Sequence, residues 1–266
     1  MNAETFQFIS DIHLEYASNR EFLKNSPILP SSDILLMAGD IMPLKDLRKQ
    51  AYFLDFLSAN YKTVYWIPGN HEFYGCDISE FEGSFSREIR KNVVLLNNQV
   101  VESHGCRLIF STLWSKIPKR TSYEVRRFMP DFREIFFKEK LFSIENYNKL
   151  HEVCFGFLKK TITGLETKRQ IVVSHHIPTF VNYPSAFRGS ILNSAFATEL
   201  GDWLIGHGPD YWIYGHHHQP VRDFTVGKTR MRCNQLGYVD NGEHFLFGSI
   251  AGGEQTDVIV LDAKQS

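Results

Sequence analysis

The chain has 266 residues, of which 43% are hydrophobic and 14% aromatic, so it can bury the core of one large α/β domain. Its formal net charge is only -1, which argues against binding to nucleic acid or to an anionic membrane through a general positive field. We therefore expect a single domain over residues 1–266 with a small ligand.

Two further features narrow the class of protein. No stretch approaches the roughly 18 apolar residues of a membrane span, and residues 1–10 lack the basic and apolar parts of a secretion signal. The four cysteines form no C-x-x-C pair, which argues against a disulfide framework or a structural zinc knuckle. We expect a cytoplasmic protein that does not enter membranes, and the sequence leaves its oligomeric state open.

The first predicted strand covers residues 5–9 and ends at a pair of polar side chains. Phe6 and Phe8 alternate with polar neighbours in this strand, and Asp11 and His13 follow it. Residues two apart in an extended chain project to the same side, so Asp11 and His13 can converge on one point. In the alternative interpretation, Asp11 caps a turn and His13 is solvated.

The next two predicted strands end in a similar way. Apolar runs at residues 34–37 and 63–67 are joined by a helical pattern over residues 44–61, as in a parallel β-α-β unit. Polar residues follow both strands, where parallel sheets place their active sites. These residues are Asp40, Asn70 and His71. Taken alone, an Asn-His pair is also typical of a structural turn.

The middle of the chain begins with a predicted helix over residues 78–90 and a strand over residues 92–96. Residues 99–103 are expected to pair with residues 107–114 through a turn at His104 and Gly105.

Residues 115–140 then lose any regular pattern and hold several basic residues, including Arg126 and Arg127, among phenylalanines. A long irregular insertion of this kind often borders a functional cleft. A solvated basic face is the alternative interpretation.

The last third of the chain alternates helices and strands again. A helix is predicted over residues 143–163, with Ser143 as N-cap and Gly164 as C-cap. Two strands, at residues 170–173 and 211–214, flank a helix over residues 194–205. A hairpin over residues 221–233 and a strand over residues 257–261 complete the predicted elements.

Histidines directly follow both of these strands. His175 and His176 come after the first strand, and a run of three histidines comes after the second. In that run, the period of two puts His216 and His218 on one side and His217 on the other, where a structural role is expected for His217.

Five predicted strand ends thus supply carboxylate, amide and imidazole groups. Such a mixture suits Mn, Fe or Zn better than Ca or Mg. A pair of these ions, divalent or of mixed valence, needs one bridging carboxylate, and Asp40 is the best-placed candidate. The residues are Asp11, His13, Asp40, Asn70, His71, His175, His216 and His218.

The ordered motifs D-x-H, G-D, G-N-H-E, a histidine after a strand and G-H-x-H resemble those of the calcineurin-like metallophosphoesterase superfamily, from residue 5 to about residue 220. The resemblance implies a four-layer α-β-β-α sandwich of two mixed sheets. It also implies that Asp40 is shared by two metal ions and that His71 is a catalytic residue outside the ligand set. The implied ligands of one ion are Asp11, His13, Asp40 and His218, and those of the other are Asp40, Asn70, His175 and His216.

A later segment, residues 233–238, looks like an Asn-Pro-Arg-Gly-Tyr motif of some bacterial members of the superfamily. Gln235 and Leu236 depart from that motif, so no role is assigned to the segment.

The expected reaction is hydrolysis of a phosphoester by a metal-bound hydroxide, with His71 supplying a proton to the leaving oxygen. We expect a small phosphorylated substrate, for which a nucleotide-like molecule is one candidate, with four candidate contacts. They are His176, Tyr74, Arg126 and Arg127. The sequence leaves phosphodiesterase and phosphomonoesterase activity equally open. A scaffold that has lost its metals is the nonenzymatic alternative, although no ligand position has been lost.

Overall fold

The computed structural model describes residues 4–103, 105–162, 168–219, 221–248 and 257–261. Within these residues, the strands form two six-stranded sheets and one small two-stranded hairpin. Both large sheets are mixed, with parallel strands in the centre and an antiparallel strand at each edge.

The first sheet is built from the N-terminal part of the chain and closed by the last strand. Its order is β14 (Val258–Leu261), β1 (Glu4–Ile9), β2 (Ile34–Ala38), β3 (Thr63–Ile67), β5 (Val93–Asn97) and β4 (Phe85–Arg90). The second sheet has the order β12 (Phe224–Val226), β13 (Thr229–Arg232), β11 (Tyr211–Ile213), β10 (Arg169–Val173), β7 (Cys106–Phe110) and β6 (Gln99–Ser103).

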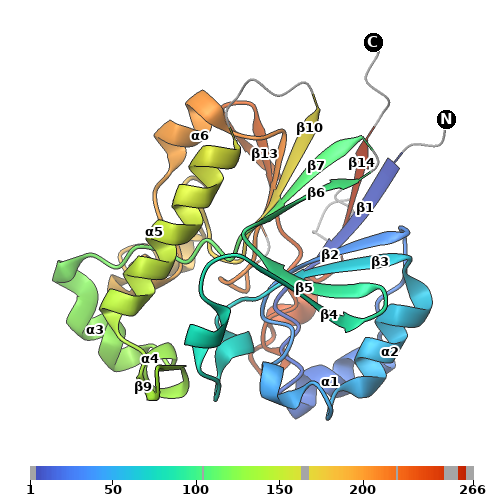
Figure 1. The fold of residues 1–266 in the computed structure, drawn as a ribbon, viewed down its shortest axis with the longest axis horizontal. Coiled ribbons are helices and arrows are strands. Elements are labelled where there is room, and N and C mark those ends of the chain that lie inside the picture. Colours follow the sequence, from blue (N-terminus) through green and yellow to red (C-terminus); the bar gives the residue numbers. More distant parts are fainter. Residues whose placement is uncertain (1–3, 104, 163–167, 220, 249–256, 262–266) are drawn as a thin grey trace.

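Helices cover the outer faces of the two sheets (Figure 1). α1 (Ala17–Asn25) and α2 (Ala51–Asn60) lie on the first sheet, and α5 (Ile144–Thr161) and α6 (Gly201–His207) lie on the second. Between the sheets, side chains of β1 and β2 pack against side chains of β7 and β10 in one buried cluster. The predicted four-layer sandwich is therefore confirmed.

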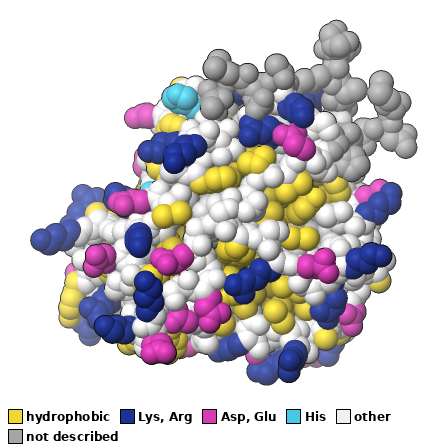
Figure 2. All heavy atoms as spheres, viewed as in Figure 1, with side chains coloured by type: hydrophobic (Ala, Val, Ile, Leu, Met, Phe, Trp, Pro, Cys, Tyr) yellow, Lys and Arg dark blue, Asp and Glu magenta, His cyan; other side chains and the backbone are white. Residues whose placement is uncertain are grey.

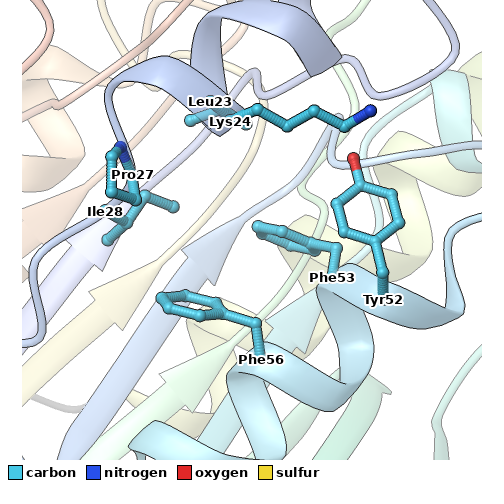
Figure 3. Close-up of a pocket in the computed structure, with 7 residues that line it drawn as sticks. All are labelled: Leu23, Lys24, Pro27, Ile28, Tyr52, Phe53 and Phe56. Atoms are coloured by element: carbon cyan, nitrogen blue, oxygen red, sulfur yellow. The ribbon is translucent and has the colours of Figure 1, made fainter.

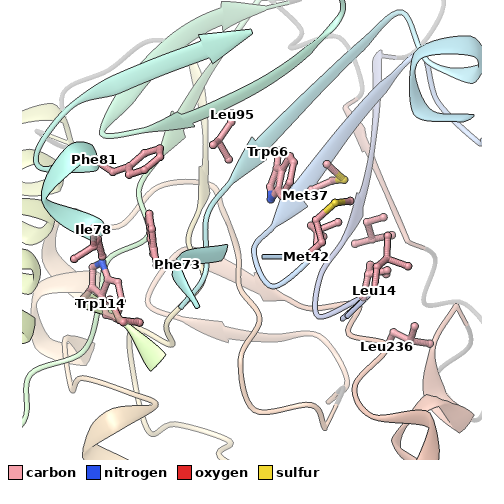
Figure 4. Packing of buried hydrophobic residues seen from close by; sticks show 14 of the residues in the cluster. Leu14, Met37, Met42, Trp66, Phe73, Ile78, Phe81, Leu95, Trp114 and Leu236 are labelled. Atoms are coloured by element: carbon pink, nitrogen blue, oxygen red, sulfur yellow. The ribbon is translucent and has the colours of Figure 1, made fainter. Parts of the chain in front are cut away.

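A second buried cluster fills the space between the first sheet and its helices. Trp66 and Met37 lie on the outer face of the sheet, and the cluster extends to Phe73, Phe81 and Trp114 (Figure 4). Because Phe73 is buried in this cluster, it takes the packing role expected of most aromatic residues.

The surface in Figure 2 carries Lys and Arg side chains next to Asp and Glu side chains, with apolar strips between them. An apolar hollow of about 220 Å³ lies between α1 and α2 and is lined mainly by Ile28, Phe53 and Phe56 (Figure 3). Among the described helices, none is long and apolar enough to cross a membrane.

The predicted irregular insertion has regular elements of its own. They are α3 (Ser122–Phe128), α4 (Asp131–Glu134) and the hairpin of β8 (Phe136–Phe137) and β9 (Lys140–Leu141). Asp77 holds this hairpin, because its carboxylate accepts hydrogen bonds from the backbone N–H groups of Lys138 at 3.0 Å and Glu139 at 2.7 Å.

The predicted helix over residues 78–90 is wrong. A 3₁₀ turn, Ile78–Phe81, is followed by strand β4, which pairs with β5. Phe85 and Ile89 are four residues apart, and this spacing fits one face of a strand as well as one face of a helix. Gly83, with φ of 77°, separates the turn from the strand.

Two other helix predictions need adjustment, and one helix was not predicted. The predicted helix over residues 44–61 is shorter, since only α2 is α-helical. The predicted helix over residues 194–205 is interrupted, because Ala197 forms a bridge with Ile177 before α6 begins. α1 was not predicted. Short 3₁₀ turns also lie at Leu44–Asp46, His71–Phe73, Lys119–Thr121, Ser185–Phe187, Ile191–Ala195, Val239–Asn241 and Glu243–Leu246.

Other predicted features agree with the structure. Ser143 caps α5 by accepting a hydrogen bond from Asn146 N at 3.1 Å, and β12 and β13 form the predicted hairpin. β6 pairs with β7 as predicted. The predicted turn residue His104 and the predicted cap Gly164 lie outside the described residues.

Candidate metal centre

The carboxyl ends of β1, β2 and β3 in the first sheet meet those of β10 and β11 in the second. The eight residues singled out at these strand ends therefore come together at one place, although they span the chain from residue 11 to residue 218. All are buried except His218, whose side chain is 12% exposed.

Two groups of potential ligands share one carboxylate. In the first group, one atom from each of four residues lies within 4.8 Å of the others, and in the second group the same holds for three residues. The first group is Asp11, His13, Asp40 and His218, and the second is Asp40, His175 and His216. The amide oxygen of Asn70 lies 3.2 Å from Nε2 of His175, beside the second group.

In each group, the distance between two imidazole nitrogens fits binding of both nitrogens to one metal ion. His13 Nε2 lies 2.9 Å from His218 Nε2, and His175 Nε2 lies 3.0 Å from His216 Nδ1. Two nitrogens at about 2.05 Å from one ion are about 2.9–3.4 Å apart for octahedral to tetrahedral angles. In addition, Oδ2 of Asp40 is buried and accepts no hydrogen bond from any described residue. The donor set therefore fits metal ions.

The backbone at these residues is unusual. Five of the eight residues have a positive φ, which residues other than glycine rarely adopt. They are Asp11 (56°), His13 (50°), Asp40 (55°), His216 (82°) and His218 (54°). The expected mechanism of convergence was therefore incomplete, because left-handed backbone as well as strand alternation aims these side chains. Such conformations concentrate at functional sites, where the surrounding structure holds them.

Two glycines in the motifs are explained by close packing. A Cβ atom at Gly69 would collide with Oδ1 of Asp40 and lie 2.7 Å from Nε2 of His175. A Cβ atom at Gly215 would lie 2.6 Å from Oδ2 of Asp11. The site leaves no room for a side chain at either position.

Glu72, the last residue of the G-N-H-E motif, connects the ends of β2 and β3 by hydrogen bonds. Its buried carboxylate accepts hydrogen bonds from the backbone N–H groups of Asp40 (2.9 Å), Ile41 (2.7 Å) and Gly69 (2.6 Å), and from Nε1 of Trp66 (3.0 Å). Burial raises the pKa of Glu72 to about 7. This residue shapes the loops after β2 and β3.

Asp131 connects the insertion to the site, and sequence reasoning missed it. Oδ1 of Asp131 accepts a hydrogen bond from Nδ2 of Asn70 at 2.8 Å and another from the hydroxyl of Tyr74 at 2.7 Å. Because the Asn70 nitrogen faces Asp131, its amide oxygen is left to face His175.

Glu15 was also missed by sequence reasoning, although it continues the spacing of Asp11 and His13. Its Oε1 lies 3.0 Å from His13 Nδ1 and 2.7 Å from His71 Nδ1. Burial raises the pKa of Glu15, but hydrogen bonds from the two histidines outweigh burial and lower it to about 2. A carboxylate two residues beyond a candidate ligand was the signal available in the sequence.

His71 lies at the entrance of the site. Its Nε2 is 3.5 Å from the hydroxyl of Tyr238 and 4.0 Å from Oδ2 of Asp40, and its ring stacks on Tyr74 with centroids 4.1 Å apart. Burial lowers the pKa of His71, but the negative charges of Asp40 and Glu15 outweigh burial and raise it above its ordinary value.

The sequence model of the calcineurin-like phosphoesterases matches residues 5–220. This chain belongs to the calcineurin-like phosphoesterase family. Its membership supports a metal-dependent hydrolase of phosphoester bonds, and the histidine and aspartate cluster is consistent with a pair of metal ions.

Individual relatives of this phosphoesterase are distant. Uncharacterized protein L509 of Acanthamoeba polyphaga mimivirus is 28% identical over 270 residues, covering 90% of this chain and 93% of that protein. The phosphopantetheinyl hydrolase PptH of Mycobacterium tuberculosis has a TM-score of 0.66 and 18% identity, over 97% of this chain and 96% of that chain. A dimetal phosphatase from Danio rerio has a TM-score of 0.46 and 14% identity, over 87% of each chain. The likeness to PptH shows the fold.

The phosphoesterase has a cavity of about 250 Å³ over the cluster. It is lined by Asp40, Asn70, His71, Tyr74, Met129, Pro130, Phe187, Phe196, His216, His217, His218, Tyr238 and Glu243. Met129 and Pro130 of the insertion line this cavity, and a functional cleft at the insertion stays a prediction. Phe187 and Phe196 were missed because they come from segments far away in the sequence, and Tyr238 lies in the segment 233–238, to which no role was assigned.

Of the four predicted substrate contacts in this phosphoesterase, Tyr74 lines the cavity. His176 is fully buried behind it, with its ring 5.0 Å from Trp114 and 4.4 Å from His216. Arg126 and Arg127 are exposed on α3 and are not among the cavity-lining residues described above.

Proposed function

We propose that this calcineurin-like phosphoesterase is a dinuclear enzyme that hydrolyses a small phosphorylated substrate. One observation carries the proposal: two groups of potential ligands share the carboxylate of Asp40. The proposed ligands of the first ion are Asp11, His13, Asp40 and His218, and those of the second are Asp40, Asn70, His175 and His216. Mn, Fe or Zn suits this mixture of oxygen and nitrogen donors.

When bound, the two ions would supply a nucleophile from water and offset the negative charge of the phosphate. The chain itself supplies the proton. The pKa of His71 is raised and its side chain lines the cavity, so it can protonate the leaving oxygen. Tyr74 stacks on the ring of His71 and restricts its rotation.

The residues that line the cavity indicate how a substrate would be held. Met129, Pro130, Phe187 and Phe196 give it an apolar flank, and among the described residues that line it there is no Lys or Arg. The charge of a phosphate would therefore be met at the metal end, while the rest of the substrate packs against apolar side chains. Phosphomonoesters and phosphodiesters both satisfy this arrangement.

Activity of the metal-loaded protein tests the proposal. Apoprotein is reloaded with Mn, Fe, Zn or Ni and assayed with 4-nitrophenyl phosphate and bis(4-nitrophenyl) phosphate. We expect at least one metal to restore hydrolysis, and Asp40→Asn, purified in parallel, to lack it. If neither ester is hydrolysed with any metal while the wild type binds two ions, the enzymatic proposal is wrong. If no metal binds, the protein is a scaffold.

A further inference from the structure

One oxygen of Glu15 lies against two histidines with different proposed duties. Oε1 of Glu15 is 3.0 Å from Nδ1 of His13 and 2.7 Å from Nδ1 of His71. The two rings are 4.5 Å apart between centroids and inclined by 76°, so they approach the oxygen from different directions. A carboxylate oxygen has two lone pairs and can accept both hydrogen bonds.

These contacts determine where the ring protons lie. An ionised carboxylate only accepts hydrogen bonds, so Nδ1 of each ring must carry a proton. Nε2 is then the atom of each ring that faces the site. Nε2 of His13 lies 2.9 Å from Nε2 of His218, and Nε2 of His71 faces the hydroxyl of Tyr238 at 3.5 Å.

We infer that Glu15 is a positioning residue that orients both a proposed metal ligand, His13, and the proposed acid, His71. It turns Nε2 of His13 toward the metal centre and Nε2 of His71 toward the leaving oxygen. This inference rests on the proposed function, in which His13 is a ligand and His71 is the acid.

The surroundings of Glu15 hold its backbone in place. Nη1 of Arg20, on α1, donates to the carbonyl oxygens of Leu14 at 2.7 Å and Glu15 at 2.9 Å. The side chain of Glu15 is only 16% exposed. Tyr74 stacks on the ring of His71, so this histidine is held both at Nδ1 and across its ring face.

A competing explanation makes the same cluster a third metal site. One atom each of His13, Glu15 and His71 lies within 4.8 Å of the others, as in the two ligand groups. If Glu15 were a ligand, removing its charge would lower the number of bound ions. If it is a positioning residue, the number of ions stays at two and their affinity falls about 10–100-fold.

The test compares Glu15→Gln with a matched control, Glu243→Gln. Oε2 of Glu243 lies 3.0 Å from Nδ1 of His218, so it supports a proposed ligand but not His71. Both variants are saturated with Mn²⁺, and ions are counted by elemental analysis. Hydrolysis is measured with 4-nitrophenyl phosphate against phenyl phosphate, and with bis(4-nitrophenyl) phosphate against diphenyl phosphate. Phenolate needs a proton to leave far more than 4-nitrophenolate does.

We expect Glu15→Gln to lower kcat for the phenyl ester about 100-fold and for the nitrophenyl ester less than about 5-fold, with KM unchanged. Glu243→Gln should weaken metal binding but slow both esters equally. In a His71→Asn background, Glu15→Gln should lower kcat for the phenyl ester less than about 5-fold, because only its contact with His13 still matters there. Equal losses on the two esters, a loss well above 5-fold on the phenyl ester in the His71→Asn background, or fewer than two ions would each overturn the inference.

Histidine ring nitrogen NMR of the apoprotein separates this inference from the proposed function. We expect protonated Nδ1 signals from His13 and His71 that lose their hydrogen-bonded chemical shift in Glu15→Ala. An unchanged spectrum would overturn the inference even if the enzyme is active. A changed spectrum in a protein that hydrolyses no ester would support the geometry and overturn only the proposed function.

Discussion

Asp40 and His175 join the two sheets at the candidate metal centre. Oδ2 of Asp40, which follows β2, lies 3.3 Å from Nε2 of His175, which follows β10, and Nδ1 of His175 donates to the carbonyl oxygen of Ala38 at 2.8 Å. Burial raises the pKa of Asp40, but His175 and the neighbouring histidines outweigh burial and hold it well below its ordinary value. The proposed bridging group is therefore a buried carboxylate that stays ionised.

His71→Asn should lower kcat by about 10²- to 10⁴-fold, because the leaving oxygen loses its proton donor. His71 is not one of the proposed ligands, so elemental analysis should still find the wild-type number of ions. Loss of both ions together with activity would mean that His71 is a ligand.

Gly69→Ala should impair metal binding, because the new Cβ would collide with Oδ1 of Asp40. Overpacking of this kind costs about 1–3 kcal/mol, which urea unfolding would measure. Gly156→Ala is the control, since no described atom outside the adjacent helix backbone lies within 4 Å of a Cβ atom at this position of α5, and alanine favours helix. Normal metal binding by Gly69→Ala would contradict the packing described for the site.

The substrate is expected to contact Phe187 rather than the arginines of α3. Phe187 lines the cavity, whereas Arg126 and Arg127 are exposed outside it. Phe187→Ala should therefore raise KM several-fold, and Arg126→Ala with Arg127→Ala should leave KM near the wild-type value. The reverse result in steady-state kinetics would restore the contacts predicted from the sequence.

Acid should loosen the hairpin of β8 and β9. Burial raises the pKa of Asp77, but hydrogen bonds from Ser79, Glu139 and Lys138 outweigh it and lower the pKa from 3.8 to about 2. A lowered folded-state pKa stabilises the fold above the unfolded value, so this contribution is lost as pH falls from about 4 to about 2. The protection of the amides of Lys138 and Glu139 against hydrogen exchange, measured relative to the intrinsic rate at each pH, should fall over this range. In Asp77→Asn, exchange should be fast already at pH 5, and slow exchange there would contradict the anchoring role.

The strand-end motifs could be predicted from the sequence because each consists of a few neighbouring residues. A short apolar run that stops at Gly39 or Gly69 marks a strand end, and the polar residue after it must lie at the edge of a parallel sheet. The order of five such motifs then predicted both the sandwich and the residues that the structure brings together.

Features that depend on distant contacts could not be predicted in this way. Asp131 reaches the site from the start of α4, and nothing in its neighbouring residues indicates that placement. Tyr238 ends the segment that looks like an Asn-Pro-Arg-Gly-Tyr motif, but its position beside His71 follows only from the tertiary structure. The misassigned helix over residues 78–90 has a different cause, because Phe85 and Ile89 suit either period and only pairing with β5 decides between them. Five positive φ values at the site likewise follow from the tertiary structure.

The metal content of Asp40→Asn shows whether this carboxylate is shared by two ions. Wild type and variant are stripped, reloaded with Mn²⁺, desalted and analysed for metal per chain, with circular dichroism as the check on folding. We expect two ions in the wild type and at most one in the variant, since both proposed sites lose their shared charge. A folded Asp40→Asn protein that retains two tightly bound ions would contradict the sharing of this carboxylate.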